Sequence, residues 1–327
     1  GDLSGYDVSS AGDVNGDGFD DLLIGNRAPH PSYLVFGGMA NLSALDAVTT
    51  SGGIAADGQI LLSDVDGTNG FGFNGLPGGG AGRAVSDAGD VNGDGIDDLL
   101  IGAPSRADDG PNAGTTYLLF GGNSLLSTLD AVITSGGTAA DGQINLVDLD
   151  GTTGFILTGT NGFVSGNSDY SGAAVSGAGD INGDGFDDLL IGAYGAAPSG
   201  PYSGASYVLF GGTSNLLSLD AVTSTGGTAG DGQINLVDVD GNTGFVINGV
   251  ASHDYSGDAV SSAGDVNGDG FDDLLIGAYG ANLNGASGQS YVVFGGNFTG
   301  GVETQVGTPS EDTLTGTADN DILIGGR

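Results

Sequence analysis

A nine-residue acidic motif, Asp-x-Asn-Gly-Asp-Gly-x-Asp-Asp, occurs four times in the chain, at residues 13–21, 90–98, 180–188 and 265–273. Side chains that carry oxygen occupy motif positions 1, 3, 5 and 9, and a glycine at position 6 permits a sharp turn that lets them converge. Carboxylate, amide and carbonyl oxygens are the ligands that calcium prefers. One copy alone could be an ordinary turn, because Asn-Gly and Asp-Gly are common turn dipeptides. Four copies in equivalent contexts instead predict four calcium-binding loops.

The spacing follows the logic of the EF-hand calcium loop, which takes ligands from positions 1, 3, 5, 7 and 9. The present motif ends with aspartate at position 9 and lacks the glutamate at position 12. The residues that follow, Asp-Leu-Leu-Ile-Gly, form a short apolar run that predicts a buried strand. Each loop is therefore expected to join two strands rather than two helices.

The composition is strongly acidic. The chain has 41 aspartate and glutamate residues against 4 basic residues, all arginine, and its formal charge is −37. Such a surface repels nucleic acid, whose binding needs a basic footprint, and it also repels anionic membranes. Because 38% of the residues are apolar and recur in short runs, a folded core is still expected.

Cysteine is absent, so any cross-links in an extracellular setting would have to come from bound metal rather than disulfides. No apolar run reaches the roughly 20 residues that span a bilayer, so membrane insertion is not expected. No signal peptide is visible at Gly1, which suggests a processed start, a fragment, or export without an N-terminal signal.

The acidic loop belongs to a cassette that occurs four times. A Ser-Gly-x-x-Val-Ser-like segment precedes the loop, Asp-Leu-Leu-Ile-Gly follows it, and an aromatic strand ending in Phe-Gly-Gly closes the cassette. A connector containing Leu-Asp-Ala-Val, Asp-Gly-Gln-Ile and Asp-x-Asp-Gly-x-x-Gly-Phe occurs three times between cassettes, for example at Leu219–Gly249. No segment of useful length has helical periodicity, and short apolar runs between Gly, Asn and Asp are typical of strands. The pattern predicts an all-β propeller or solenoid.

The cassette resembles the FG-GAP repeat of integrin-alpha-type β-propellers over residues 1 to about 296, and most resembles the bacterial extracellular versions. This resemblance implies a propeller with one calcium ion, about four in all, in the turn between the first two strands of each blade. By position, the side-chain ligands it implies are Asp13, Asn15, Asp17 and Asp21; Asp90, Asn92, Asp94 and Asp98; Asp180, Asn182, Asp184 and Asp188; and Asp265, Asn267, Asp269 and Asp273. The position-7 carbonyls are those of Phe19, Ile96, Phe186 and Phe271.

The number of cassettes departs from the seven blades common in the family. We expect four large blades that close a small ring, with repeats at about 1–75, 76–165, 166–250 and 251–296. Each Gly-Phe-x-x-x-Gly segment would supply a fourth strand, and the rest of a connector an inserted hairpin. Seven small blades, four from cassettes and three from connectors, are the alternative. The fourth cassette lacks a Gly-Phe segment, so residues 297–306 form either a linker or, through Val302–Val306, a closing strand supplied within the chain or by a neighbour.

Residues 307–327 change to a nine-residue period, in which Gly307-Thr308 recurs as Gly316-Thr317 and Asp312 as Asp321. This tail resembles the start of an RTX calcium-binding repeat, although Ser310 and Asp319 replace an expected glycine. In relatives such repeats accompany type I export from Gram-negative bacteria.

Three further groups of residues could bind a ligand or take part in catalysis: the connector aspartates, the two histidines and the tyrosines. The connector segments Asp64–Gly67, Asp148–Gly151 and Asp238–Gly241 are interpreted as turns, and His30 and His253 as unrelated loop residues. Most tyrosines are expected to pack in the core, whereas the loop residues Tyr194, Tyr202 and Tyr279 are better candidates for a binding face. The repeats share no Ser, His and Asp constellation, so no catalytic residue is predicted and the segment is not expected to be an enzyme.

The expected function is that of an extracellular or cell-surface calcium-binding module with a structural or adhesive role in a larger secreted bacterial protein. Its expected ligand is a protein or glycan that the sequence does not identify, and no cofactor other than calcium is expected. Two alternatives stay open: a self-assembling fibre or surface-layer subunit joined by strand exchange, and a non-catalytic propeller attached to a secreted hydrolase.

Overall fold

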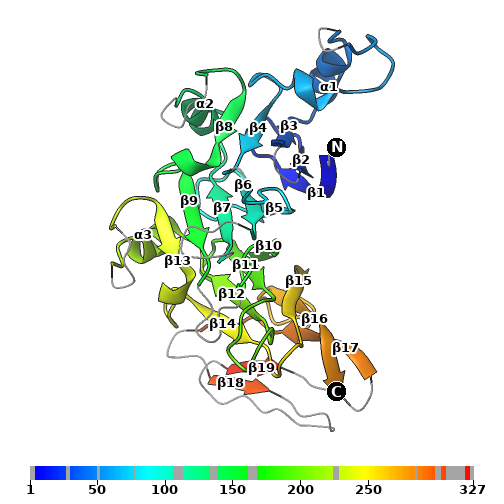
Figure 1. The fold of residues 1–327 in the computed structure, drawn as a ribbon. Coiled ribbons are helices and arrows are strands. Elements are labelled where there is room, and N and C mark those ends of the chain that lie inside the picture. The colour runs from blue at the N-terminus through cyan, green and yellow to red at the C-terminus, as the bar shows by residue number, and fades with distance from the viewer. Residues whose placement is uncertain are drawn as a thin grey trace.

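The computed structural model describes residues 4–26, 30–49, 52–76, 78–105, 113–132, 138–160, 168–223, 228–283, 286–298, 303–306 and 321–324. Most of the regular structure is β, and the strands form four large sheets in chain order and one small sheet near the C-terminus (Figure 1). In the described residues no helix has the length and apolar character needed to cross a membrane.

Each large sheet is one blade whose first three strands come from one cassette. The first blade contains β1 (Ser4–Gly12), β2 (Asp21–Asn26), β3 (Ser32–Val35) and β4 (Gly70–Asn74). The second contains β5 (Ala84–Gly89), β6 (Asp98–Ala103), β7 (Thr115–Leu119) and β9 (Gly154–Thr158). The third contains β10 (Ala174–Gly179), β11 (Asp188–Ala193), β12 (Ala205–Leu209) and β14 (Gly244–Asn248). The fourth has three strands, β15 (Ser256–Gly264), β16 (Asp273–Leu283) and β17 (Ala286–Val293).

The Gly-Phe segments supply the fourth strands, as predicted. Strands β4, β9 and β14 pair antiparallel with the aromatic strands β3, β7 and β12. Each begins at a glycine with a positive φ angle, as at Gly154, where φ is 140°. A Cβ at Gly154 would lie 2.1 Å from the Leu118 carbonyl oxygen, so only glycine permits the strand to start this close to its neighbour.

The prediction of an inserted hairpin in each connector was wrong. The connectors instead form the helices α1 (Met39–Asp46), α2 (Asn123–Asp130) and α3 (Thr213–Asp220), and 3₁₀ turns at Leu62–Asp64, Leu146–Asp148 and Leu236–Asp238. Two connectors also contain a short strand, β8 (Gln143–Asn145) and β13 (Gln233–Asn235), which pairs in parallel with the last strand of the preceding blade. The described connector residues form no sheets of their own, since β8 and β13 join the large sheets, and this arrangement favours four blades over seven.

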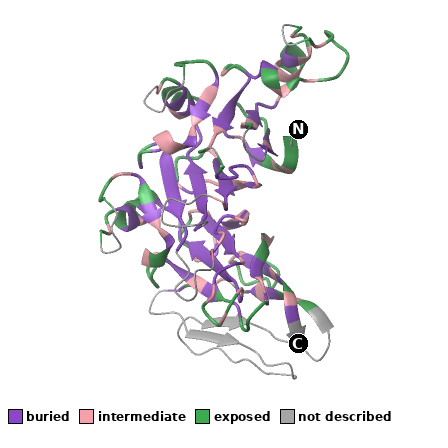
Figure 2. Cartoon of the chain, viewed as in Figure 1, coloured by how far each residue is buried: buried purple, intermediate pink, exposed green. Residues whose placement is uncertain are grey.

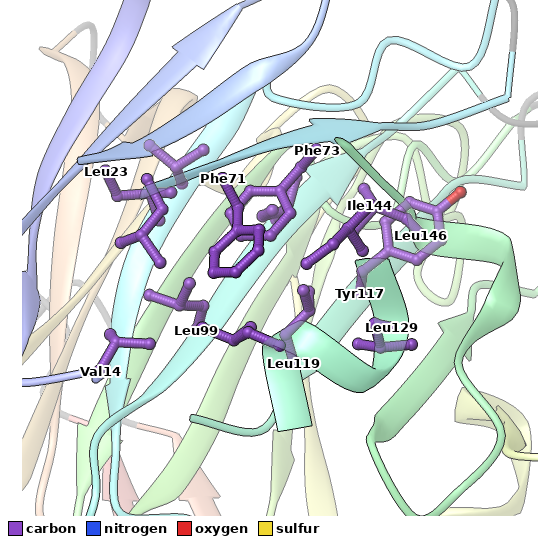
Figure 3. Close-up of a cluster of buried hydrophobic side chains, with 14 of the residues drawn as sticks. Val14, Leu23, Phe71, Phe73, Leu99, Tyr117, Leu119, Leu129, Ile144 and Leu146 are labelled. Atoms are coloured by element: carbon purple, nitrogen blue, oxygen red, sulfur yellow. The ribbon is translucent and has the colours of Figure 1, made fainter. Parts of the chain in front are cut away.

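The four blades pack face to face in an open row. Their first strands follow one another in the order β1, β5, β10 and β15, and the first and last blades stand at opposite ends (Figure 1). One apolar core lies between each pair of successive blades. Figure 3 shows the first of these cores, where Leu23 and Phe71 of blade one meet Leu99 and Leu119 of blade two. The expected closed four-blade ring is therefore not the arrangement of the described residues.

The segment expected to complete the fourth blade pairs elsewhere. Strand β18 (Glu303–Val306) pairs in parallel with β19 (Asp321–Ile324) in a separate two-stranded sheet, and no described pairing joins it to the fourth blade. The RTX-like pattern falls largely on residues 307–320 and 325–327, which lie outside the described residues.

Candidate calcium-binding loops and an aromatic row

Each acidic loop joins the first and second strands of a blade, as predicted, and folds its oxygens back onto its own backbone. In the second loop, Asp90 Oδ1 and Oδ2 accept hydrogen bonds from the backbone N–H groups of Asp94 and Gly95, at 2.9 and 2.8 Å. Asn92 Oδ1 accepts from Asp94 N–H at 2.8 Å, and Asp94 Oδ1 accepts from Ile96 N–H at 3.0 Å. The same bonds recur in the other three loops. The loop sequence therefore fixes one backbone shape in all four blades.

The aspartate at position 9 is buried in every blade and connects the loop to the third strand. Asp98 Oδ1 accepts a hydrogen bond from Gly121 N–H at 2.8 Å, and its Oδ2 accepts from Val91 N–H at 3.1 Å. Gly121 is the first glycine of a Phe-Gly-Gly sequence, which explains why that sequence closes each cassette. The equivalent residues Asp21, Asp188 and Asp273 make the same bond to Gly37, Gly211 and Gly295.

Burial raises the pKa of Asp21, Asp98 and Asp188. It raises the pKa of Asp98 to about 8 and that of Asp21 to about 6, and the neighbouring loop carboxylates add to the effect. The pKa of Asp188 is raised well above its usual value for the same reason. With 4 arginines and no lysine in the chain, basic side chains are too few to balance these acids. Backbone N–H groups, such as those of Val91 and Gly121 at Asp98, favour the ionised form, and a bound cation would favour it further.

The donor set fits a hard cation, since every ligand atom that the sequence offers is an oxygen. Asp21 Oδ2 is buried without a hydrogen-bond partner, which leaves an acceptor that a cation could use. Among the described residues, however, no group of three or more histidine, aspartate or glutamate side chains is arranged to hold a metal ion. The loop aspartates instead accept hydrogen bonds from backbone N–H groups of their own loops.

The connector aspartates lie in turns, as interpreted from the sequence. Asp150 Oδ1 accepts hydrogen bonds from the N–H groups of Thr152 and Thr153, at 3.0 and 3.2 Å. Partial burial opposes ionisation of Asp150, but these hydrogen bonds outweigh it and lower its pKa. Asp240 accepts equivalent bonds from Asn242 and Thr243. These acids therefore stabilise the turns that lead into the fourth strands.

A second candidate site is a row of aromatic side chains on blades three and four. The rings of Tyr170 and Tyr194 stack with centroids 5.1 Å apart, and those of Tyr255 and Tyr279 stack at 4.9 Å. These are equivalent pairs in successive repeats, and Tyr194 and Tyr255 join them with centroids 6.4 Å apart. Tyr202 lies 5.5 Å from Tyr255 by the same measure. We call these five residues the tyrosine row.

The structure thus brings together the three tyrosines that the sequence favoured for a binding face, and adds Tyr170 and Tyr255. The loop prediction was wrong for Tyr279, which lies within strand β16 because that strand continues past its Asp-Leu-Leu-Ile segment to Leu283. His253 also contacts the row, with its ring 5.9 Å from that of Tyr202. His30, in contrast, lies in the loop before β3 and is exposed. The two histidines are therefore unrelated to each other, as predicted.

The backbone under the tyrosine row is strained. Of the six non-glycine residues with positive φ among the described residues, four lie here: Tyr170, Tyr202, His253 and Tyr255, at φ of 53° to 67°. Such a conformation costs of order 1 kcal/mol for each residue and persists only where the surroundings impose it. Gly195 and Gly280 leave room for two of these side chains, because a Cβ at either would lie 2.7 Å from the ring of Tyr170 or Tyr255.

The row ends at an open groove of about 340 Å³ beside Tyr279. Asp258, Gln289 and Ser290 contribute polar side chains to the groove. Tyr279 stacks on Tyr255 with one face and is 58% exposed, so an aromatic surface stands next to hydrogen-bonding groups. Burial raises the pKa of Asp258, and the charge of Arg83 opposes this shift.

These blades, with an acidic loop at the first turn of each, define a repeat module of the β-propeller type. The FG-GAP repeat model matches four segments of the chain, residues 4–32, 77–119, 171–209 and 256–293. Modules of this type are often extracellular, and they generally bind ligands rather than catalyse reactions. No curated protein matches the chain.

Proposed function

We propose that the chain is a calcium-stabilised extracellular binding module of a larger secreted bacterial protein. Calcium would be held by the position 1, 3, 5 and 9 side chains and the position-7 carbonyl of each loop. When bound, it supplies positive charge beside acids that otherwise repel one another. The buried position-9 aspartates support this proposal, because their ionisation needs a nearby positive charge that the chain itself lacks.

One loop aspartate and one turn aspartate should respond differently to removal. The variant Asp184→Ala is expected to bind one calcium ion fewer than the wild type, whereas Asp150→Ala should keep the full number. Asp150 bonds only to threonines of its own turn, and its loss should cost about 1 kcal/mol of stability without affecting metal binding. Isothermal titration calorimetry gives both stoichiometries. Loss of one site from both variants would show that the connectors also bind metal.

We further propose that the tyrosine row and its groove bind a glycan. The exposed face of Tyr279 offers an apolar platform for a sugar ring, and Asp258, Gln289 and Ser290 can hydrogen-bond to sugar hydroxyl groups. The main support for a glycan site is the exposed face of Tyr279 next to three polar side chains.

A glycan array probed with and without calcium tests this assignment. For any sugar that binds, Tyr279→Ala should weaken affinity at least about tenfold, which corresponds to about 1.4 kcal/mol. Tyr6→Ala is the matched control, because Tyr6 is also an exposed tyrosine but belongs to blade one. Equal loss of affinity in both variants, or binding only to protein ligands, would refute the glycan assignment.

A further inference from the structure

The two ends of the blade row expose surfaces that are buried between blades. In the Asp-Leu-Leu-Ile strands, the first leucine packs toward the preceding blade and the second toward the following one. The first leucine is fully buried in blades two to four, but Leu22 of blade one is 48% exposed. The second is fully buried in blades one to three, but Leu275 of blade four is 40% exposed. Each end therefore presents one half of the interface between blades.

The loop residue at position 2 follows the same rule. It is fully buried in the first three blades, as Val14, Val91 and Ile181, yet Val266 of blade four is 57% exposed. At the opposite end, Val8 and Phe19 of blade one are exposed. Figure 2 shows exposed residues, in green, on the first strand near the N-terminus. The apolar surfaces at the two ends are thus those that would pack on one another if another blade junction formed.

Hydrogen bonds at the three internal junctions are also the same. The position-8 carboxylate of one loop accepts from the position-1 N–H of the preceding loop: Asp97 from Asp13, Asp187 from Asp90 and Asp272 from Asp180, at 2.7, 2.8 and 3.0 Å. The second glycine of each Phe-Gly-Gly donates to the position-2 carbonyl of the preceding loop: Gly122 to Val14, Gly212 to Val91 and Gly296 to Ile181, at 2.7 to 2.8 Å.

Side-chain shape completes each junction. The position-7 residue of one loop covers the position-4 glycine of the loop before it, and a Cβ at Gly93 or Gly183 would lie 2.3 or 2.4 Å from the ring of Phe186 or Phe271. At Gly268 of the last loop, an added Cβ would meet nothing within 4 Å. Within the described part of the chain, no blade covers this position.

We propose that the chain associates with a second copy of itself, blade four of one molecule packing on blade one of the next. The Asp20 carboxylate would accept from the Asp265 N–H of the second copy. Gly38 N–H would donate to the Val266 carbonyl, and Phe19 would cover Gly268. Since the two surfaces differ, the contact is head-to-tail and heterologous, so copies form either a closed ring or a growing chain. This mode packs blade faces together and exchanges no strand.

The high negative charge of the chain should make this association depend on the salt concentration. Copies that each carry a formal charge of −37 repel one another, and this repulsion weakens as salt shortens the screening length to about 8 Å at physiological ionic strength. Calcium at the loops would reduce it further. Association is therefore expected to strengthen with salt, as an apolar contact between acidic molecules should.

The test uses two variants that each block one end. Leu22→Glu places a charge on the blade-one surface and Leu275→Glu on the blade-four surface. In analytical ultracentrifugation with calcium and salt, the wild type should form species of two or more chains that increase with concentration. Each variant alone should remain a monomer. Their mixture should form a dimer that grows no further, because each variant contributes its one intact end.

Leu217→Glu is the matched control, since Leu217 lies on α3 with similar exposure and should leave assembly unchanged. Thermal melts of all variants establish that each is folded. If Leu275→Glu melts early, Val266→Ser blocks the blade-four end without adding charge, and Val8→Ser does the same at the blade-one end in place of Leu22→Glu. A wild type that stays monomeric, or a mixture that forms no dimer, overturns the proposal. Self-association that survives both variants also overturns it, because another surface would then be responsible.

Discussion

Removal of calcium is expected to lower the melting temperature by about 8 to 16 °C. Extracellular calcium modules have dissociation constants of about 10⁻⁴ to 10⁻³ M, so about 10 mM calcium should stabilise each site by roughly 1.4 to 2.7 kcal/mol. Four sites together would then contribute more than about 5 kcal/mol. With an unfolding entropy of about 2.1 cal/mol/K per residue, each kcal/mol shifts the midpoint of this 327-residue chain by about 1.5 °C. The absence of disulfides makes the metal term a large part of the total stability.

Thermal melts of metal-stripped protein, with and without added calcium, measure this effect. Magnesium at the same concentration is the control for simple charge screening. It should stabilise less than calcium, because it demands a tighter octahedral site and gives up its water reluctantly. An unchanged midpoint after complete metal removal would contradict the proposed role of the loops.

The blade architecture could be predicted from the sequence because each strand carries its own pattern. The Gly-Phe-x-x-x-Gly segment of each connector was correctly assigned as a fourth strand. Its apolar residues mark a buried strand, and its first glycine is required where the backbone approaches the neighbouring carbonyl, as at Gly154 and Leu118. The glycine and the apolar residues can be recognised in the sequence of one repeat, and the same residues occur again in the next repeat.

The connector helices were missed because they are too short to show periodicity. Each has 8 residues, and in α2 only Leu126, Leu129 and Asp130 are buried. Two leucines spaced by three residues do not distinguish a helix from a strand or a loop. Isolated helices of this length are also unstable, so these form because the blades pack against them rather than through intrinsic propensity.

The open row and the complete tyrosine row could not be predicted, since both depend on how repeats are placed relative to one another. Sequence favoured Tyr194, Tyr202 and Tyr279 because all three were expected in loops, although Tyr279 lies in β16. Tyr170 and Tyr255 precede Ser-Gly strand segments, and nothing in their sequence indicates a left-handed backbone or a stacking partner from another loop. Ring closure failed for a related reason. The residues chosen for it, 302–306, have suitable β character, but β18 pairs with β19 instead.

The pH dependence of stability is expected to change sign when calcium is removed. Burial raises the pKa of Asp98 to about 8 in the folded state, while the ordinary pKa of an aspartate is 3.8. Without metal, this group does not oppose folding below about pH 4, where it is protonated in both states. Between that pH and about 8, ionising Asp98 costs more free energy in the folded protein than in the unfolded chain, so the free energy of unfolding falls as the pH rises. Asp21, with a pKa raised to about 6, adds to the cost over the lower part of this range. Calcium prefers the ionised carboxylates, so in its presence a rise in pH should strengthen binding and raise stability.

Melting temperatures of metal-stripped and calcium-loaded protein at about pH 5 and about pH 8 test the reversal. The metal-free midpoint should fall with pH and the calcium-loaded midpoint should rise. General repulsion among surface acids also grows with pH, so the comparison needs variants of equal charge. Asp98→Asn should flatten the metal-free slope, whereas Asp94→Asn, which removes the same charge from an exposed loop position, should leave it steep. If the metal-free protein instead becomes more stable between these pH values, or if the two variants behave alike, the buried position-9 carboxylates are not the groups that link stability to calcium.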